Sequence, residues 1–273
     1  MANASPRRKK HSPSPVVPSS HRSVARYGWI PDFPDQRDFL YSAPPVYLRE
    51  LPPEIDLRSA CPPVYDQGQL GSCTANAIGG AIQFDQMKER LPDIFLPSRL
   101  FIYYNERVLE GSVSSDAGAM LRDGIKTVAK QGACPESVWP YIISKFKLKP
   151  NSTCYTEAAK HRAVSYQRLV QSLPQMKGCL ASGYPFVFGF TVYESFETQQ
   201  AARTGHIPMP ASSERVLGGH AVCAVGYNDT NRTFLCRNSW GASWGIKGYF
   251  TIPYAYLTDP DLSADFWTIR VVE

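Results

Sequence analysis

The chain changes its residue pattern at about residue 160, and this change constrains the fold more than any other feature. From Cys73 to about residue 130 the sequence contains long stretches that are typical of helices. After about residue 160, short β-branched and aromatic runs are separated by Gly, Asn and Asp, a pattern typical of antiparallel strands. A helical half followed by a sheet half predicts an α+β fold with two lobes and a site between them.

We expect the helical lobe at about 73–160 and an antiparallel, barrel-like sheet lobe at about 161–273. In the first half, helices are predicted within 73–90, 97–109 and 118–132, with Ser98 as an N-cap and Gly132 as a stop. The second half predicts one helix within 167–183, and strands at 186–193, 220–228, 232–240, 248–254 and 266–272.

The first 26 residues differ in composition from the rest. They are rich in Ser and Pro and contain no acid, whereas their basic residues are Arg7, Arg8, Lys9, Lys10, Arg22 and Arg26. Because the whole chain has a net charge of +5, the remainder is close to neutral and has no nucleic-acid footprint. We expect residues 1–26 to be a disordered tail. They lack the apolar region of a secretory signal, and no run is long enough to span a membrane, so localisation stays open between the cytoplasm and a leaderless export route.

Residues 27–50 are interrupted by Pro but carry several large apolar side chains, namely Trp29, Ile30, Phe33, Phe39 and Tyr41. Such a composition is unusual for a solvated linker. We therefore expect an extended strap on the surface of the body.

Seven cysteines are spread along the chain, at positions 61, 73, 134, 154, 179, 223 and 236. An odd number leaves at least one thiol outside any internal disulfide, and no C-x-x-C pair indicates zinc or redox chemistry. Several of them lie in apolar runs, where a free cysteine packs as a small hydrophobic residue. This usage is compatible with a reducing compartment.

Cys73 follows a Gly-Ser pair in "DQGQLGSCTANAIGGAIQF", residues 66–84, at the start of a predicted helix. A helix N-terminus favours the thiolate, which is the nucleophilic form of cysteine. Taken alone, the pattern equally fits a buried structural cysteine.

His220 is the histidine best placed to act as a base, because it follows a Gly pair at the opening of an apolar strand. A satisfied core histidine is the alternative. Asn238 and Trp240 follow in "LCRNSWGASWGIKGYF", where an amide could orient the imidazole and an indole could exclude water. Cys, His and Asn form a known nucleophile–base–orienter arrangement.

Three stretches together resemble the papain family of cysteine peptidases. "DQGQLGSC" is similar to the family's Q-G-x-x-G-S-C, "GGHAVCAVGY" to H-A-V-x-A-V-G-Y, and "RNSWGASWGIKGYF" to N-S-W-G-x-x-W-G-x-x-G-Y. The resemblance covers about residues 51–273 and implies the papain-like two-lobed fold. About 50 residues precede it, so it points to the short, bacterial-type members without a long pro-domain.

The resemblance implies a role for each matching residue. Cys73 would be the nucleophile, and His220 the base and later the acid. Asn238 would orient His220, and Trp240 would shield the pair. Gln67 would donate a side-chain N–H to the oxyanion, together with the backbone N–H of Cys73.

The resemblance also implies substrate-binding positions. Gly118 would offer its backbone to an extended substrate. The pocket for the second residue before the scissile bond would be lined by Met120, Gly189, Gly218 and Ala221. These small walls favour bulky hydrophobic side chains, and no residue is assigned to the pocket floor. Gly219, which precedes His220 where papain has an acid, and Trp240 would also be substrate-binding residues.

We therefore predict a monomeric cysteine endopeptidase that acts on polypeptides through an acyl-enzyme, without metal or organic cofactor, and with the strap at 27–50 as a candidate cover of its cleft. Two alternatives stay open: an amidase or acyl transferase using the same residues, and a non-catalytic peptide-binding protein on a peptidase scaffold.

Overall fold

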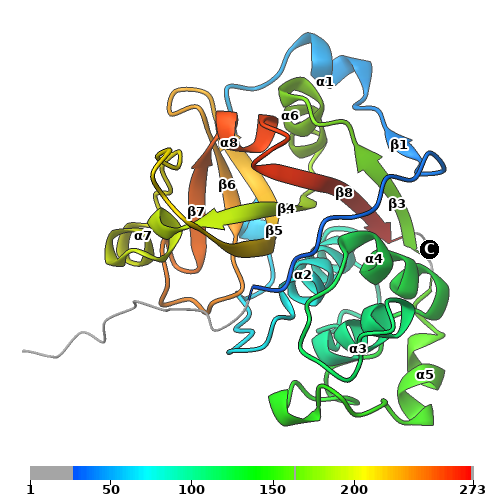
Figure 1. Ribbon diagram of the computed structural model, residues 1–273. Helices are drawn as coiled ribbons and strands as arrows, with labels where there is room; N and C mark the ends of the chain where they lie inside the picture. Colours follow the sequence, from blue (N-terminus) through cyan, green and yellow to red (C-terminus); the bar gives the residue numbers. More distant parts are fainter. Residues whose placement is uncertain (1–26, 163, 272–273) are drawn as a thin grey trace, which may run out of the picture.

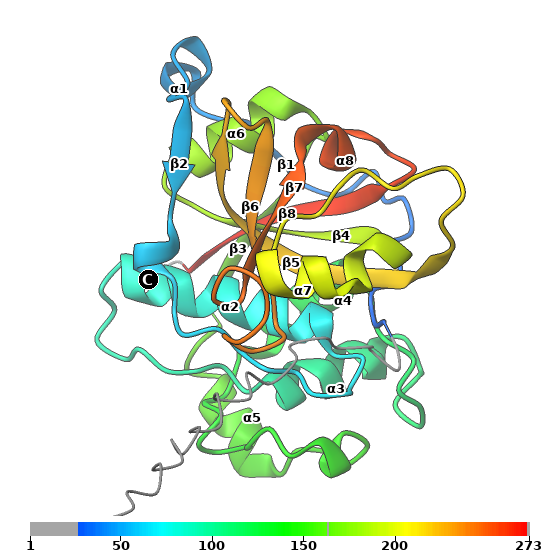
Figure 2. The same cartoon turned by 90° about the vertical axis from the view of Figure 1, so that its left-hand side faces the viewer.

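The helices and the strands form two lobes. The computed structural model describes residues 27–162 and 164–271, so the predicted disordered tail lies outside the described residues. Figure 1 shows the sheet above helices α2, α3, α4 and α5, and Figure 2 shows the same division after a quarter turn. The predicted α+β class is confirmed.

Each predicted helix and strand has a counterpart in the structure. The helices are α1 (Pro45–Arg49), α2 (Cys73–Lys88), α3 (Arg99–Leu109), α4 (Leu121–Gln131), α5 (Ser152–Ala158), α6 (Leu173–Ala181), α7 (Gln199–Thr204) and α8 (Tyr254–Thr258), with 3₁₀ turns η1 (Arg58–Ala60), η2 (Ile143–Lys145) and η3 (Glu194–Glu197). The strands are β1 (Leu40–Tyr41), β2 (Glu54–Asp56), β3 (Val164–Leu169), β4 (Phe186–Tyr193), β5 (Val216–Asn228), β6 (Thr233–Arg237), β7 (Tyr249–Pro253) and β8 (Ser263–Val271). Of these helices and strands, α1, α5, α7, α8, β1, β2 and β3 were not predicted.

Local signals explain where several elements begin and end. The Ser98 side chain accepts a hydrogen bond from the Phe101 N–H, as expected of an N-cap, and Gly132 ends α4 with φ of 83°. The prediction for 167–183 was wrong at its start, because residues up to Leu169 belong to β3 and the helix begins at Leu173. Among the described residues, no helix combines the length and the apolar character needed to cross a bilayer.

One mostly antiparallel sheet forms the sheet lobe. Its strand order is β1-β3-β8-β4-β5-β6-β7, and β2 pairs with β5. The order ends at β1 and β7, so the sheet is open rather than closed into a barrel. Helix α2 packs on its central strands β5, β4 and β8. This contact brings the start of α2, the middle of β5 and the end of β6 to one place.

The segment predicted as a surface strap contributes to the body of the protein. Strand β1 pairs in parallel with β3, and Tyr41 and Ala43 are buried in the core of the sheet lobe. Helix α1 packs against α6. Upstream of β1, the chain passes between the sheet and helices α2 and α4 (Figure 1).

Candidate active site

Cys73 is the first residue of α2 and has no exposed surface. The first N–H groups of a helix lack partners within the helix and favour negative charge. Burial nevertheless raises the pKa of the Cys73 thiol to about 12, while backbone hydrogen bonds from Ala221 and Gly28 act in the opposite direction. Burial of the Cys73 side chain therefore favours the neutral thiol over the thiolate.

His220 and Asn238 form a buried pair. His220 lies on β5 opposite Phe190 of β4, and Asn238 directly follows β6. The His220 Nε2 atom is 2.9 Å from Asn238 Oδ1, which also accepts the Ser239 N–H at 2.8 Å. Since Oδ1 is an acceptor, Nε2 carries the proton in this hydrogen bond, and Nδ1 is the nitrogen left for proton exchange with a nucleophile.

Aromatic rings surround the imidazole of His220. Trp240 stacks on it with a centroid distance of 5.1 Å and an interplanar angle of 30°, and Phe190, Phe196 and Tyr27 approach it edge-on. These rings keep water from the His220–Asn238 hydrogen bond, which strengthens it. Trp240 is therefore in direct contact with the imidazole that it was predicted to shield.

Gln67 is fixed by contacts from both lobes. Its backbone N–H donates to Ser239 O at 2.9 Å, and its Oε1 accepts from the Ser239 hydroxyl. The Gln67 Nε2 donates to Leu70 O at 2.9 Å, and the Tyr141 hydroxyl donates to Gln67 O at 2.8 Å. Because Leu70 O can only accept, it determines which end of the Gln67 amide is Nε2, and the Ser239 hydroxyl then holds the opposite end, Oε1.

Residues 27–30 lie over this site, and we call them the overlying segment. Gly28 O accepts from the Ala119 N–H at 2.8 Å, and the Ile30 N–H donates to Ala119 O at 3.0 Å. The overlying segment therefore runs parallel to the chain at Ala119. On the other side, the Trp29 N–H donates to Gly219 O at 2.8 Å. The segment is thereby bound to both lobes, and Trp29 is only 8% exposed.

Several predicted substrate-binding residues contact this segment. A Cβ atom added to Gly189 would lie 1.9 Å from the Trp29 ring, and one added to Gly219 would lie 2.7 Å from it. Gly218 faces Tyr27 instead, and Gly118, with φ of 80°, faces the backbone of Gly28.

Ala221 and Met120 are the two remaining residues that were predicted to line the substrate pocket. Ala221 belongs to the apolar cluster that contains Cys73 and Trp29, and the Met120 N–H donates to Glu110 Oε1 at 2.7 Å. The prediction singled out Gly118, whereas Ala119 makes the backbone hydrogen bonds with the segment. Ala119 was missed because the sequence has no signal for which residue of this stretch offers its backbone.

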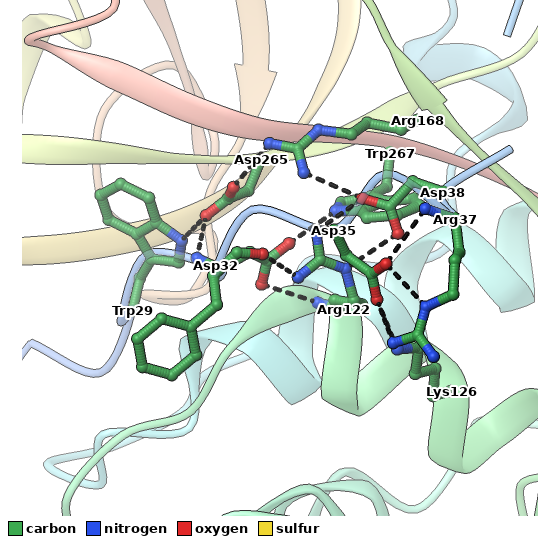
Figure 3. A network of polar contacts seen from close by, with 11 residues as sticks. Trp29, Asp32, Asp35, Arg37, Asp38, Arg122, Lys126, Arg168, Asp265 and Trp267 are labelled. Carbon is green, nitrogen blue, oxygen red and sulfur yellow. Dashed lines mark hydrogen bonds and ion pairs between the residues drawn. The ribbon is translucent and has the colours of Figure 1, made fainter. Parts of the chain in front are cut away.

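The Asp265 carboxylate lies beside the Trp29 ring and points toward its nitrogen (Figure 3). Its Oδ2 accepts from Trp29 Nε1 at 3.1 Å and from the Asp32 N–H at 2.8 Å, and its Oδ1 is 3.3 Å from the Arg168 guanidinium. Asp265 is 2% exposed. Its side chain is therefore a buried acceptor that three parts of the chain share.

A wider polar network continues from Asp265 and anchors the chain just downstream of the overlying segment (Figure 3). Asp32 accepts from the Arg122 N–H at 3.0 Å and from Trp267 Nε1 at 3.0 Å, and Asp38 pairs with Arg122 and Arg168. Burial, followed by the charge of Asp265, raises the pKa of Asp32 to about 7. Burial also raises the pKa of Asp265.

All seven cysteines are free thiols. Within residues 27–162 and 164–271, no group of three His, Cys, Asp or Glu side chains is arranged to hold a metal ion.

The family model "Papain family cysteine protease" matches residues 51–256. The chain belongs to the papain family of cysteine proteases. It is a hydrolase of that family, and the resemblance in the three motifs is confirmed.

Individual relatives agree with this assignment. An uncharacterized peptidase C1-like protein of Acanthamoeba polyphaga mimivirus is 44% identical over 270 residues, which span 90% of this chain and 87% of that protein. Among solved structures, xylellain, a cysteine protease from Xylella fastidiosa, has a TM-score of 0.86 at 45% identity and covers 90% of this chain and 96% of its own. Digestive procathepsin L 3 of Tenebrio molitor, at 17% identity and a TM-score of 0.63 over 92% of this chain and 77% of its own, is similar in fold.

Proposed function

We propose that this protease is an endopeptidase in which Cys73 is the nucleophile, His220 the proton carrier and Asn238 the residue that orients it. The observation that supports this most directly is the buried hydrogen bond from His220 Nε2 to Asn238 Oδ1, because it leaves Nδ1 for the thiol at the start of α2.

The proposed reaction has two halves. Cys73 transfers its proton to His220, and its sulfur attacks the scissile carbonyl carbon. The imidazolium returns the proton to the amine as the C–N bond breaks, which leaves a thioester on Cys73. Water then loses a proton to His220 and attacks the thioester, and the carboxylic acid product leaves as Cys73 is reprotonated.

The proposed oxyanion donors are the side-chain amide of Gln67 and the backbone N–H of Cys73. An amide carries two N–H donors, so one can remain on Leu70 O while the other faces the oxyanion. The Ser239 hydroxyl supports this role by fixing the amide orientation.

We assign substrate binding to the residues that contact the overlying segment. Gly189, Gly219 and Ala221, with Met120, would border the pocket for the second residue before the cut, and the absence of side chains on the glycines leaves room for a bulky group. Gly118, together with Ala119, would pair with the substrate backbone. Gly218, which was predicted from the sequence to line the same pocket as Gly189, faces Tyr27 rather than Trp29, so we now assign it, with Trp240, to the leaving-group side.

We further propose that the overlying segment restrains the enzyme. Tyr27 lies near Trp240, Gly28 beside Gly71 and Cys73, and Trp29 in the proposed pocket. A substrate that places its second residue before the cut in that pocket must run from the pocket toward Trp240. The segment runs the opposite way, so it occupies the site without presenting a peptide bond in the productive direction.

Gly28→Ala in the full-length chain tests both proposals. A Cβ atom at this position would lie 1.8 Å from Gly71 O, so the variant should expel the segment while leaving every proposed catalytic residue intact. We would measure hydrolysis of a short peptide with leucine or phenylalanine two residues before the cut. Gln36→Ala, an exposed change in the same N-terminal region, is the matched control, and Cys73→Ala is the blank.

The expected result is faster hydrolysis by Gly28→Ala than by the wild type or Gln36→Ala, with none by Cys73→Ala. Equal rates in wild type and Gly28→Ala would leave the peptidase proposal standing and reject restraint. Absence of hydrolysis by all folded proteins would reject the endopeptidase proposal.

A further inference from the structure

We propose that Asp265 is a specificity-determining residue that selects tryptophan at the second position before the scissile bond. Its carboxylate would accept a hydrogen bond from the substrate indole in the space that Trp29 occupies. This inference rests on the proposed function and names the substrate class of that same site.

The protein itself provides the template for this substrate. The Trp29 side chain lies against the two glycines Gly189 and Gly219, and its Nε1 donates to Asp265 Oδ2 at 3.1 Å. A buried polar atom needs a partner, so a side chain that replaces Trp29 without an N–H would leave this acceptor one hydrogen bond short. The space beside Gly189 and Gly219 therefore favours a large aromatic ring. The Asp265 acceptor favours a ring that carries an N–H donor.

The backbone at Asp265 directs the carboxylate to this place. Asp265 has φ of 59°, which is uncommon for a residue with a side chain. The register between β4 and β8 also shifts here, because Val187 pairs with Trp267 whereas Gly189 pairs with Ala264. The extra residue on β8 forms a β-bulge, a feature that re-aims a side chain and is common beside functional sites.

Two contacts of Asp265 are made by residues other than Trp29. The Asp32 N–H donates to the same Oδ2 atom, and Arg168 lies beside Oδ1. Both donors belong to the anchored network downstream of the overlying segment, so release of residues 27–30 would leave the carboxylate in position.

The charges around Asp265 favour a neutral donor over a cation. Arg168 already forms an ion pair with this carboxylate, and Arg122 lies in the same network. A substrate arginine would therefore meet a carboxylate already paired with Arg168, beside the Arg122–Asp38 pair, and would lose its hydration. An indole N–H satisfies the acceptor without adding charge.

The test compares two peptides in the full-length Gly28→Ala protein. They differ only two residues before the cut, where one has tryptophan and the other has 3-benzothienylalanine, which has nearly the same shape but lacks the N–H. We expect kcat/KM to be about tenfold higher for the tryptophan peptide, because a hydrogen bond to a charged acceptor is worth about that factor. A third peptide with arginine at this position should be cleaved more slowly than the tryptophan peptide.

The variant Gly28→Ala/Asp265→Asn tests the residue itself. Asparagine tolerates the left-handed backbone but removes the negative charge, so a hydrogen bond from the indole to its one oxygen is weaker than one to the carboxylate. The ratio of kcat/KM for the two peptides should therefore fall to about threefold or below. This ratio compares two substrates on one protein, so the amount of folded variant cancels.

The outcomes separate this inference from the proposed function. If Gly28→Ala cleaves both peptides equally, or the arginine peptide fastest, the selection by Asp265 is overturned and the peptidase stands. If the Asp265→Asn variant keeps the tenfold ratio, the selection belongs to another residue. If Gly28→Ala cleaves no peptide, the proposed function itself fails.

Discussion

Cys73 has no contact with solvent in the described state, and this burial controls the charge of its sulfur. Since burial raises the pKa of the thiol to about 12, wild-type Cys73 should react with iodoacetamide slowly at neutral pH and faster as the pH rises. Gly28→Ala should uncover the sulfur and shift the rate–pH profile toward lower pH. Mass spectrometry of the modified peptide measures the rate at this cysteine alone. Identical profiles for wild type, Gln36→Ala and Gly28→Ala would show that the segment does not control this thiol.

Ser239 acts through Gln67 and is a positioning residue in the proposed mechanism. Ser239→Ala, in the Gly28→Ala background, should lower kcat by roughly tenfold, less than the 100- to 1,000-fold typical of losing an oxyanion donor itself. The change should be mainly in kcat, since the substrate pocket is untouched. In a protein that also carries Gln67→Ala, Ser239→Ala should have little further effect. Additive effects would instead show that Ser239 acts independently of Gln67.

Strand β4 carries a glycine where a strand normally carries a side chain, and the packing of Trp29 explains it. Gly189→Ala would place a Cβ atom 1.9 Å from the indole. In the Gly28→Ala background it should reduce kcat/KM for a peptide with tryptophan or phenylalanine two residues before the cut. A peptide with alanine at that position should lose far less. Equal losses on both peptides would mean that Gly189 does not border this pocket.

Most elements could be predicted from sequence because their signals are local. The N-cap at Ser98, the stop at Gly132 and the apolar strand at 186–193 depend on neighbours along the chain. The helix within 167–183 was placed too early, because the polar residues at the end of β3 resemble the exposed face of a helix.

The proposed catalytic residues could be found in advance because each lies in a motif. Asp265 could not, since its place in the site depends on a bulge in β8 and on its contacts with Trp29, Asp32 and Arg168. These partners are far from Asp265 in sequence, and no short pattern around Asp265 indicates that it contacts them.

At the scale of the whole molecule, residues 27–50 divide into the overlying segment and an anchor. Pro31 and the residues up to Arg49 include buried Tyr41 and Ala43 and the ion pair of Asp38 with Arg122. A chain beginning at Leu51 should therefore be less stable than one beginning at Pro31, by about 3–5 kcal/mol for the loss of a buried aromatic side chain alone. Urea unfolding of both chains with Cys73→Ala measures the difference. Equal midpoints and slopes would mean that the anchor is dispensable.

The carboxyl of Asp32 links stability to pH. Its pKa is raised from 3.8 to about 7 by burial, and then by Asp265, so the folded protein holds this proton more tightly than the unfolded chain. The resulting stabilisation is complete below pH 3.8 and is lost as the pH rises to about 7. Asp32→Asn should flatten this part of the profile of unfolding free energy against pH, measured in the Cys73→Ala background. An unchanged slope would show that Asp32 does not hold the proton.

The shared carboxylate of Asp265 has a consequence for how such an enzyme can diversify. In this proposal the Oδ2 atom of Asp265 accepts a hydrogen bond either from Trp29 or from the substrate side chain. A mutation of Asp265 that changes the preferred substrate therefore also weakens the hydrogen bonds that hold the protein's own N-terminal region. Under selection, residues 29 and 265 should therefore change together. A protein whose preferred substrate side chain changes must also change the residue of the overlying segment that occupies the same pocket.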